Sequence, residues 1–368
     1  MSYVLEAMET GWISSSGKFV SEFETNFANY CDVRYGVAVC NGTVALHLAL
    51  EALGIGAGDE VIIPAFTMIA TAAAVCYTGA RPVFVDANPD TWNLDPDLVE
   101  DKVTDRTKAI LPVHIMGYPC DMNKLQGIAE KYGLFVLEDA AEAHGALWRG
   151  RKVGSLGNLA TFSFFANKNL TTGEGGMVVT NDEGLYDRCR YLKNLAFPLK
   201  AAREYIHEDL GFNYRMSNLH AAIGLAQVEK ADEYRSRRIH NHRQYRDMLA
   251  GIPGIEHQFD PAYANDQQEL HDTVHVHWMN AININQERYG RSRDALMALL
   301  RENGIDSRKL FTGMHRQPAL AKLGCDMSGK YPVTDRLAEN GFYLPSGSSL
   351  TLEQIERICS IIREGARA

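Results

Sequence analysis

Three groups of residues in this chain could bind a charged, aromatic ligand and react with it. The first is Lys168, which follows the apolar run around Ser163 and precedes a turn rich in threonine and glycine. Burial disfavours the ammonium form of a lysine, so the pKa falls and the neutral amine becomes a nucleophile toward carbonyls. The alternative interpretation of Lys168 is a solvated loop lysine beside a hairpin turn, because most lysines are exposed.

The other two groups lie at predicted strand ends. Asp139 directly follows the apolar run 134–138. A carboxylate there either caps the next segment or holds a cationic group of a ligand. The Asn41-Gly42-Thr43 turn joins a strand-like run to a helix. Free N–H groups at a helix start, together with a hydroxyl, favour an anion such as phosphate.

Together these groups match the needs of one cofactor. Pyridoxal phosphate needs a lysine for its aldehyde, a carboxylate for its pyridinium nitrogen and an anion site for its phosphate. Lys168 and Asp139 meet the first two needs, and Gly42, Thr43 and Ser163 meet the third. The stretch between Asp139 and Lys168 leaves room for one more strand or hairpin.

The elements that must position these groups alternate between strands and helices. Strands are predicted at 35–40, 60–64, 82–86, 109–114, 134–138 and 177–180, and helices at 19–30, 44–53, 69–77, 96–103, 123–132 and 183–195. Such alternation predicts an α/β fold with a mainly parallel sheet covered by helices on both faces. Ligands of such sheets collect at the carboxyl ends of the strands.

The C-terminal part of the chain predicts a second, smaller unit. Ser217 is expected to cap a long helix that runs to about residue 249, where Pro253 and Gly254 stop it. The remaining predicted segments are a loop at 196–216, a strand at 275–284, a helix at 294–303, an extended run at 305–311 and a closing helix at 352–363. We therefore expect a large domain over 1–250 and a smaller α/β domain over 251–368.

Composition limits the class of protein. The 368 residues are 46% hydrophobic, which is enough for a large core. A formal net charge of −9 does not favour nucleic acid as a partner. The basic run Arg235, Arg237, Arg238, His240, His242 and Arg243 is interpreted as the solvated face of a helix.

Cysteine usage and apolar runs indicate the compartment. The seven cysteines form no Cys-x-x-Cys pair, and the histidines and cysteines show no metal-ligand spacing. We therefore expect no metal site and a reducing, cytoplasmic setting. The N-terminus lacks the pattern of a signal peptide, and no apolar run reaches membrane-spanning length.

The glycine-rich run 54–58 (GIGAG) is expected to be a turn that ends a helix. A dinucleotide-binding fingerprint would follow a strand, and no strand precedes this run. This argues against a nucleotide-binding dehydrogenase.

With these residues considered together, the chain resembles the DegT/DnrJ/StrS family of sugar aminotransferases. Members of that family are fold-type I enzymes that use pyridoxal phosphate. The resemblance covers nearly the whole chain, and its stretches are 11–24, 41–50 (NGTVALHLAL), 58–67, 79–86, 136–146 (VLEDAAEAHGA), 161–178 (TFSFFANKNLTTGEGGMV), 212–227, 304–308, 314–318 and 344–347. The segments SFFANK, TTGEGGMVV, EDAAEAHG and MHRQP are most similar to the branch that aminates C4 of GDP-4-keto-6-deoxymannose.

The resemblance implies a role for each matching residue. Lys168 would take the cofactor's aldehyde and would move protons between Cα of the amino acid and C4′ of the cofactor. Asp139 would keep the ring nitrogen protonated. Glu142 would contact the 3-hydroxyl of the cofactor. The family usually has glutamine at this position, and glutamate here resembles the branch that aminates C4 of the GDP-linked sugar.

Other residues would shape the cofactor pocket. Gly42, Thr43 and Ser163 would hold the phosphate. Asn213 would reach the phosphate of the neighbouring subunit's cofactor, which implies a homodimer with shared active sites. Met68 stands where the family commonly has an aromatic ring over the cofactor, and its thioether can still pack on the ring face.

Three further features concern the substrate side. His315 lies where the family's small domain approaches the sugar; the alternative is a structural surface histidine. Ala73 replaces a usual asparagine. The N-terminus begins inside the first family helix and lacks the extended lead-in. The three departures from the family pattern, at Met68, at Ala73 and at the N-terminus, bear on cofactor stacking and on the edge of the substrate cleft. They do not bear on the fold.

The activity implied is transfer of an amino group from L-glutamate to a nucleotide-linked 4-keto-6-deoxysugar, with GDP-4-keto-6-deoxymannose as the best match. Amination at C3, and a dTDP or UDP sugar, are open alternatives. A related branch that dehydrates sugars at C3 has histidine in place of the lysine, so Lys168 argues against it. The alternative from another class is a non-catalytic regulatory protein that binds pyridoxal phosphate.

Overall fold

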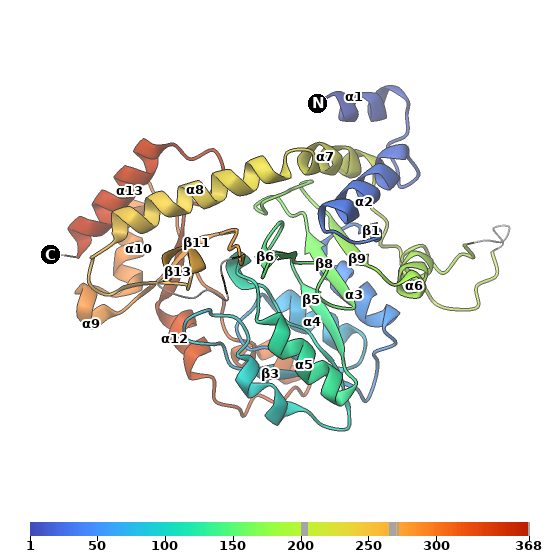
Figure 1. Cartoon of the computed structure of the whole chain (residues 1–368), viewed down its shortest axis with the longest axis horizontal. Helices are drawn as coiled ribbons and strands as arrows, with labels where there is room; N and C mark the ends of the chain where they lie inside the picture. Colours follow the sequence, from blue (N-terminus) through green and yellow to red (C-terminus); the bar gives the residue numbers. More distant parts are fainter. Residues whose placement is uncertain (200–204, 265–269, 271, 367–368) are drawn as a thin grey trace.

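A seven-stranded sheet forms the centre of the molecule (Figure 1). The computed structural model describes residues 1–199, 205–264, 270 and 272–366. The strand order is β1-β9-β8-β5-β4-β2-β3. Strand β9 runs antiparallel to both of its neighbours, and the other strands are parallel to one another. The strands are β1 Tyr35–Val39, β2 Glu60–Pro64, β3 Arg81–Val85, β4 Thr107–Ile110, β5 Phe135–Asp139, β8 Leu159–Ser163 and β9 Gly176–Thr180.

Helices cover both faces of this sheet, as the alternation predicts. One core contains residues of α3, α4 and α6. The opposite core contains residues of α2, α5 and α7. Successive residues of one strand enter opposite cores: Val61 and Ile63 enter the first, and Ile62 enters the second. The helices are α1 Ser2–Glu9, α2 Lys18–Tyr30, α3 Gly42–Ala52, α4 Ile69–Tyr77, α5 Met122–Tyr132, α6 Glu183–Lys193 and α7 Asn218–Val228. A hairpin of β6 Leu147–Trp148 and β7 Arg151–Lys152 lies between β5 and β8 in the chain.

A second, four-stranded antiparallel sheet follows, with the order β10-β11-β13-β12. Its core takes Tyr245 and Leu249 from the long helix α8, which runs from the large sheet to this second unit (Figure 1). The domain boundary near residue 250 stays a prediction. The elements are α8 Ala231–Leu249, β10 Ile255–His257, β11 Asn280–Ile284, α9 Gln286–Tyr289, α10 Arg293–Glu302, β12 Arg308–Lys309, α11 Pro318–Lys322, α12 Pro332–Asn340, β13 Gly341–Leu344 and α13 Leu352–Gly365.

The run 54–58 forms the expected turn, because it lies between the end of α3 and the start of β2. Of the predicted loop 196–216, residues 200–204 lie outside the described residues. Within the described part of the chain, every helix is too short or too polar to cross a membrane.

Two predicted helices are wrong in their extent. Residues 96–103 form two short 3-10 turns, Pro96–Leu98 and Glu100–Lys102, and Asp95 caps the first. So short a segment is a marginal α-helix, and its β-branched residues weaken it further. The helix expected from Ser217 to about residue 249 is broken between α7 and α8 at Glu229 and Lys230. No glycine or proline marks this break in the sequence.

The strand predicted at 275–284 begins only at Asn280. His277 has a φ of 48°, in the left-handed region, and so turns the chain. On either side of His277, the backbone N–H groups of Val276 and Trp278 donate to the carbonyl oxygens of Gly117 and Met116. This segment therefore links the second unit to the loops of the large sheet.

The basic run on α8 is not a solvated face throughout. Arg238 is 7% exposed and His242 is 5% exposed. Arg238 donates to the carbonyl oxygens of Trp278, at 2.9 Å, and of Ser346. The spacing from 238 to 242, 245 and 249 is the inward stripe of a helix, so these polar residues share the face of Tyr245 and Leu249.

The free energy of unfolding is expected to fall in mild acid, because His242 on this stripe and the neighbouring His275 and His277 are buried. Burial lowers the pKa of His242 to about 4 and lowers the pKa values of His275 and His277 well below their usual range. The unfolded chain binds protons first, at about pH 6.5, so the free energy of unfolding decreases as pH falls below that value. His242 alone accounts for about 3 kcal/mol by pH 4.

The measurement is urea unfolding at pH 7.5 and pH 5 in the presence of a chelator. His242→Gln removes one titrating group, so this variant is expected to lose less stability between the two pH values. Equal losses in the variant and the wild type would contradict the assignment.

Candidate active site

The predicted site residues meet at one edge of the large sheet. Asp139 and Ser163 are the last residues of β5 and β8, and the Asn41 turn directly follows β1. These three strands are parallel, so their carboxyl ends lie at the same edge.

Lys168 follows β8 in a loop rather than ending the strand itself. The strand ends at Ser163, and Phe165, which the sequence places in the strand, is 45% exposed. The side chain of Lys168 is 11% exposed, and its Nζ lies 3.9 Å from Oε1 of Glu142. Nζ also lies 3.8 Å from the ring centre of Trp278. Burial lowers the pKa of Lys168, and the carboxylates of Glu142 and Asp139 act in the opposite direction.

Glu142 is the buried partner of this lysine. Its Oε2 accepts the backbone N–H of Met116 at 2.7 Å. Burial raises the pKa of Glu142 to about 7, against the opposing charge of Lys168. Lys168 and Glu142 thus favour each other's charged form across 3.9 Å, whereas burial disfavours the charged form of both.

Asp139 is buried and keeps free acceptor capacity. Its Oδ2 accepts the hydroxyl of Thr71 at 2.9 Å, and its Oδ1 accepts the backbone N–H of Ala141 at 3.2 Å. Burial raises the pKa of Asp139, whereas these two donors lower it. A carboxylate has about four lone-pair sites, so Asp139 can accept a further donor from a ligand.

The third part of the site is a cradle of backbone at the start of α3. Within the Asn41-Gly42-Thr43 turn, Asn41 is the N-cap: its Oδ1 accepts the N–H of Val44 at 3.0 Å, and the helix begins at Gly42. The N–H groups of the first turn, including those of Gly42 and Thr43, have no intrahelical acceptor. A Cβ at Gly42 would lie 2.7 Å from Cβ of Ser163, so only glycine fits there.

Three predicted residues lie apart from this cluster. Met68 is the residue before α4 and is 50% exposed. Asn213 is exposed and pairs through its backbone with Asn194. His315 lies 2.9 Å from Asp335, measured from Nε2 to Oδ1. Among the described residues, no hydrogen bond or ion pair joins Met68, Asn213 or His315 to the catalytic cluster.

Sequence reasoning missed two residues of the site. Thr71 donates to Asp139 from within α4, and its only signal is a polar residue in a run of alanines, three positions after Met68. Trp278 is 5% exposed, and its Nε1 donates to the backbone oxygen of Asn167 at 3.0 Å. The sequence does not indicate that Trp278 belongs to the site, because the pattern before Asn280 predicts a regular strand.

The residues present fit pyridoxal phosphate. Lys168 has a buried amine, and Asp139 has unused acceptor sites that can take the N–H of a pyridinium. The backbone approach at Gly42 leaves a helix N-terminus beside the Ser163 hydroxyl, which suits a phosphate. These are the three contacts that the cofactor requires.

Known proteins share this organisation over the whole chain. The chain is 43% identical over 362 residues to the GDP-perosamine synthase of Escherichia coli O157:H7, covering 98% of our chain and 94% of that protein. It is 44% identical over 363 residues to the GDP-perosamine synthase of Caulobacter vibrioides, covering 98% and 93%. It is 39% identical over 352 residues to the dTDP-3-amino-3,4,6-trideoxy-alpha-D-glucose transaminase of Streptomyces venezuelae, covering 95% and 88%. The crystal structure of DesV from S. venezuelae superposes with a TM-score of 0.90 at 37% identity, covering 100% of our chain and 94% of that chain.

The fold and the site define a pyridoxal-phosphate-dependent aminotransferase of fold type I. The model of the DegT/DnrJ/EryC1/StrS aminotransferase family matches residues 1–363, and the chain belongs to that family.

Proposed function

We propose that this enzyme transfers an amino group from L-glutamate to C4 of GDP-4-keto-6-deoxymannose, giving GDP-perosamine. The observation that carries the proposal is the similarity, along almost the full length of both chains, to two GDP-perosamine synthases. Glu142 also supports the proposal. The wider family usually has glutamine at this position, whereas glutamate resembles the branch that makes GDP-perosamine. We place the reaction in the cytoplasm, as a step that supplies the O-antigen of lipopolysaccharide.

Each group of the site has one task in this proposal. Bound pyridoxal phosphate supplies an aldehyde that exchanges with amino groups and a ring that takes up carbanion charge. Lys168 would take the aldehyde in the resting enzyme, and its neutral amine would remove and return protons at the substrate carbon. Burial lowers its pKa and so raises the fraction of the neutral amine relative to an exposed lysine.

The other residues orient the cofactor. Asp139 would hold the proton on the ring nitrogen, and Glu142 would contact the 3-hydroxyl. Gly42, Thr43 and Ser163 would bind the phosphate through N–H groups and hydroxyls. Burial raises the pKa of Asp139, and a cationic partner such as a protonated pyridine ring would act in the opposite direction and favour its carboxylate form.

The remaining predicted residues serve the edges of the site. Met68 would pack its thioether on the face of the ring. His315 would approach the sugar from the second unit. We propose that Asn213, which is exposed in the single chain, reaches the phosphate held by a second copy. Activity would then require a homodimer with shared active sites.

The test is the visible absorption spectrum of the purified enzyme. L-Glutamate is expected to convert the cofactor to its amino form and so to remove the resting band. Candidate ketosugar nucleotides are then added one at a time, and GDP-4-keto-6-deoxymannose is expected to restore the band. A spectrum that glutamate leaves unchanged would contradict the amino donor. If only another ketosugar nucleotide restores the band, the proposed substrate is wrong and the proposed reaction class still holds.

One alternative substrate class has its own support. The Streptomyces relative at 39% identity is named as a transaminase of a dTDP sugar. A 3- or 4-aminotransferase acting on a dTDP- or UDP-linked ketosugar is therefore the second candidate. The same spectral assay distinguishes it, because only the sugar that accepts the amino group restores the band.

A further inference from the structure

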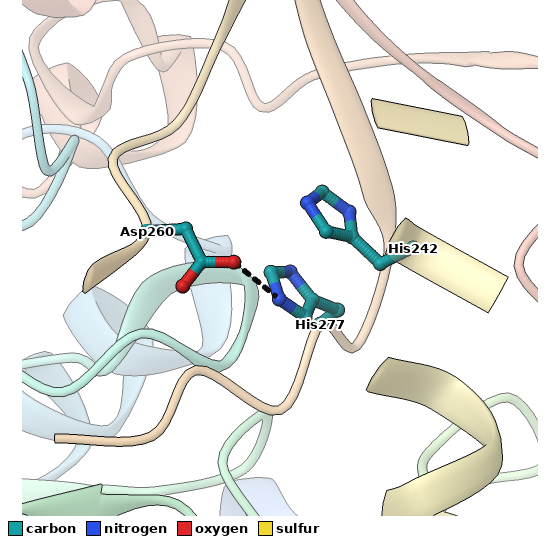
Figure 2. Close-up of side chains that lie close together, drawn as sticks. All are labelled: His242, Asp260 and His277. Carbon is teal, nitrogen blue, oxygen red and sulfur yellow. Dashed lines mark ion pairs between the residues drawn. The ribbon is translucent and has the colours of Figure 1, made fainter. Parts of the chain in front are cut away.

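A cluster of buried metal-binding side chains lies outside the active site. His242 projects from α8, Asp260 precedes a short 3-10 turn at Pro261–Tyr263, and His277 lies in the segment before β11 (Figure 2). One ligand atom from each of the three residues lies within 4.8 Å of the others. Their exposed fractions are 5%, 6% and 3%. Such burial of polar groups requires partners for them.

The hydrogen bonds fix the free nitrogen of His242. Its Nδ1 lies 3.0 Å from Oδ1 of Asn280, which can only accept, so Nδ1 carries the proton. Nε2 then has a lone pair, and no described residue donates to it. A carbonyl oxygen on one ring nitrogen, with a lone pair on the other, is the arrangement that orients histidine ligands of metals.

His277 and Asp260 complete the donor set. Nε2 of His277 lies 3.2 Å from Oδ2 of Asp260. The other ring nitrogen, Nδ1, is buried and has no partner among the described residues. Figure 2 shows the Asp260 carboxylate facing the two imidazole rings. The cluster thus offers two imidazole nitrogens and one carboxylate oxygen, a combination that suits zinc and related first-row ions.

We propose that His242, Asp260 and His277 bind a divalent first-row metal ion, Zn²⁺ in the first instance. Hard cations such as Mg²⁺ are disfavoured, because two of the three ligands are imidazoles. The cluster is next to the candidate active site in the chain, because the residue after His277, Trp278, contacts Lys168.

Room for a further ligand and an entry route are present. Asp260 and His277, together with His275, line a cavity of about 370 Å³. Water from this cavity can complete a tetrahedral site. The rings of His242 and His277 are stacked at 3.5 Å between centres, with 6° between planes. Binding therefore requires the two rings to rotate so that their lone pairs converge on one point.

Neighbouring charges moderate the expected affinity. Arg246 is near enough to Asp260 for the two charges to influence each other, and Arg243 lines the same cavity. Both arginines repel a cation. Asp260 is the one carboxylate of the cluster, so its charge is the main electrostatic attraction for the ion.

The experiment is equilibrium dialysis of the untagged holoenzyme against zinc at neutral pH, with bound metal counted by elemental mass spectrometry. About one zinc per chain is expected, and excess Mg²⁺ is not expected to compete. His242→Gln and Asp260→Asn are each expected to weaken binding by at least about tenfold. His240→Gln is the matched control, because His240 is exposed on the same helix, and it is expected to bind zinc as the wild type does.

Folding of each variant is checked by circular dichroism and by the visible band of the bound cofactor. If a ligand variant does not fold, Asn280→Ala replaces it. This change keeps all three ligands and removes the Oδ1 acceptor of His242 Nδ1, together with the side-chain donor to Pro345 and Ser346. It is expected to weaken zinc binding about 10- to 100-fold. The proposal is overturned if wild-type enzyme binds no stoichiometric zinc. It is equally overturned if the folded cluster variants bind zinc as the wild type does, or if His240→Gln alone removes binding.

Discussion

Replacing Lys168 with alanine is expected to reduce amino transfer by at least about 10⁴-fold, because one acid–base group contributes roughly 10²- to 10⁴-fold and this one also exchanges covalently with the substrate amine. The cofactor is expected to stay bound through Asp139 and the backbone cradle at Gly42. Turnover and the cofactor content after gel filtration are the two measurements.

Lys124→Ala is the matched control for this change. Lys124 is an exposed lysine that pairs with Asp97 on the surface. It is expected to leave turnover unchanged. Turnover retained in the Lys168 variant would refute the assignment of the reacting amine. Loss of the cofactor together with turnover would instead show that the lysine is needed for binding.

Asp139→Asn is expected to slow turnover by about 10²- to 10³-fold, the size of the effect when one partner of a buried ion pair is removed. Asparagine keeps the shape, and its oxygen can still accept the hydroxyl of Thr71. The neutral amide cannot hold a proton on the ring nitrogen by charge. Turnover under saturating cofactor separates this effect from weaker cofactor binding.

The stability of the cofactor-free variant shows whether this effect is local. Burial already raises the pKa of Asp139 without a ligand, so the amide is expected to leave the unfolding midpoint of the apoprotein nearly unchanged. Asp97→Asn, at an exposed aspartate, is the control for turnover. A variant of Asp139 that transfers amino groups at the wild-type rate would remove this residue from the proposed mechanism.

The strand ends were the predictable part of the site. Asp139 and Ser163 end mainly apolar strands, and parallel strands bring their carboxyl ends to one edge. The sequence also placed the turn before α3, and Asn41 is the residue of that turn that caps the helix. Local patterns were sufficient here because each residue is positioned by the strand that immediately precedes it.

The contacts made across the fold could not be predicted. Thr71 meets Asp139 only because α4 packs over the end of β5, and no local pattern records that meeting. Trp278 reaches Lys168 because the chain turns at His277, where a side chain tolerates positive φ at some cost. The break between α7 and α8 likewise follows from the two units that these helices pack on, since neither glycine nor proline lies there.

The backbone cradle divides the site into parts that tolerate change differently. A Cβ at Gly42 would collide with Ser163, and a Cβ at Gly176 would lie 2.3 Å from the backbone oxygen of Asn41. Every amino-acid substitution at these two positions therefore introduces a clash, whatever the new side chain is. His315, which we propose approaches the sugar, is held by its side-chain contact with Asp335 rather than by a close approach of backbone. A library that randomises the second unit while holding these glycines fixed would explore new sugar acceptors on an unchanged cofactor platform.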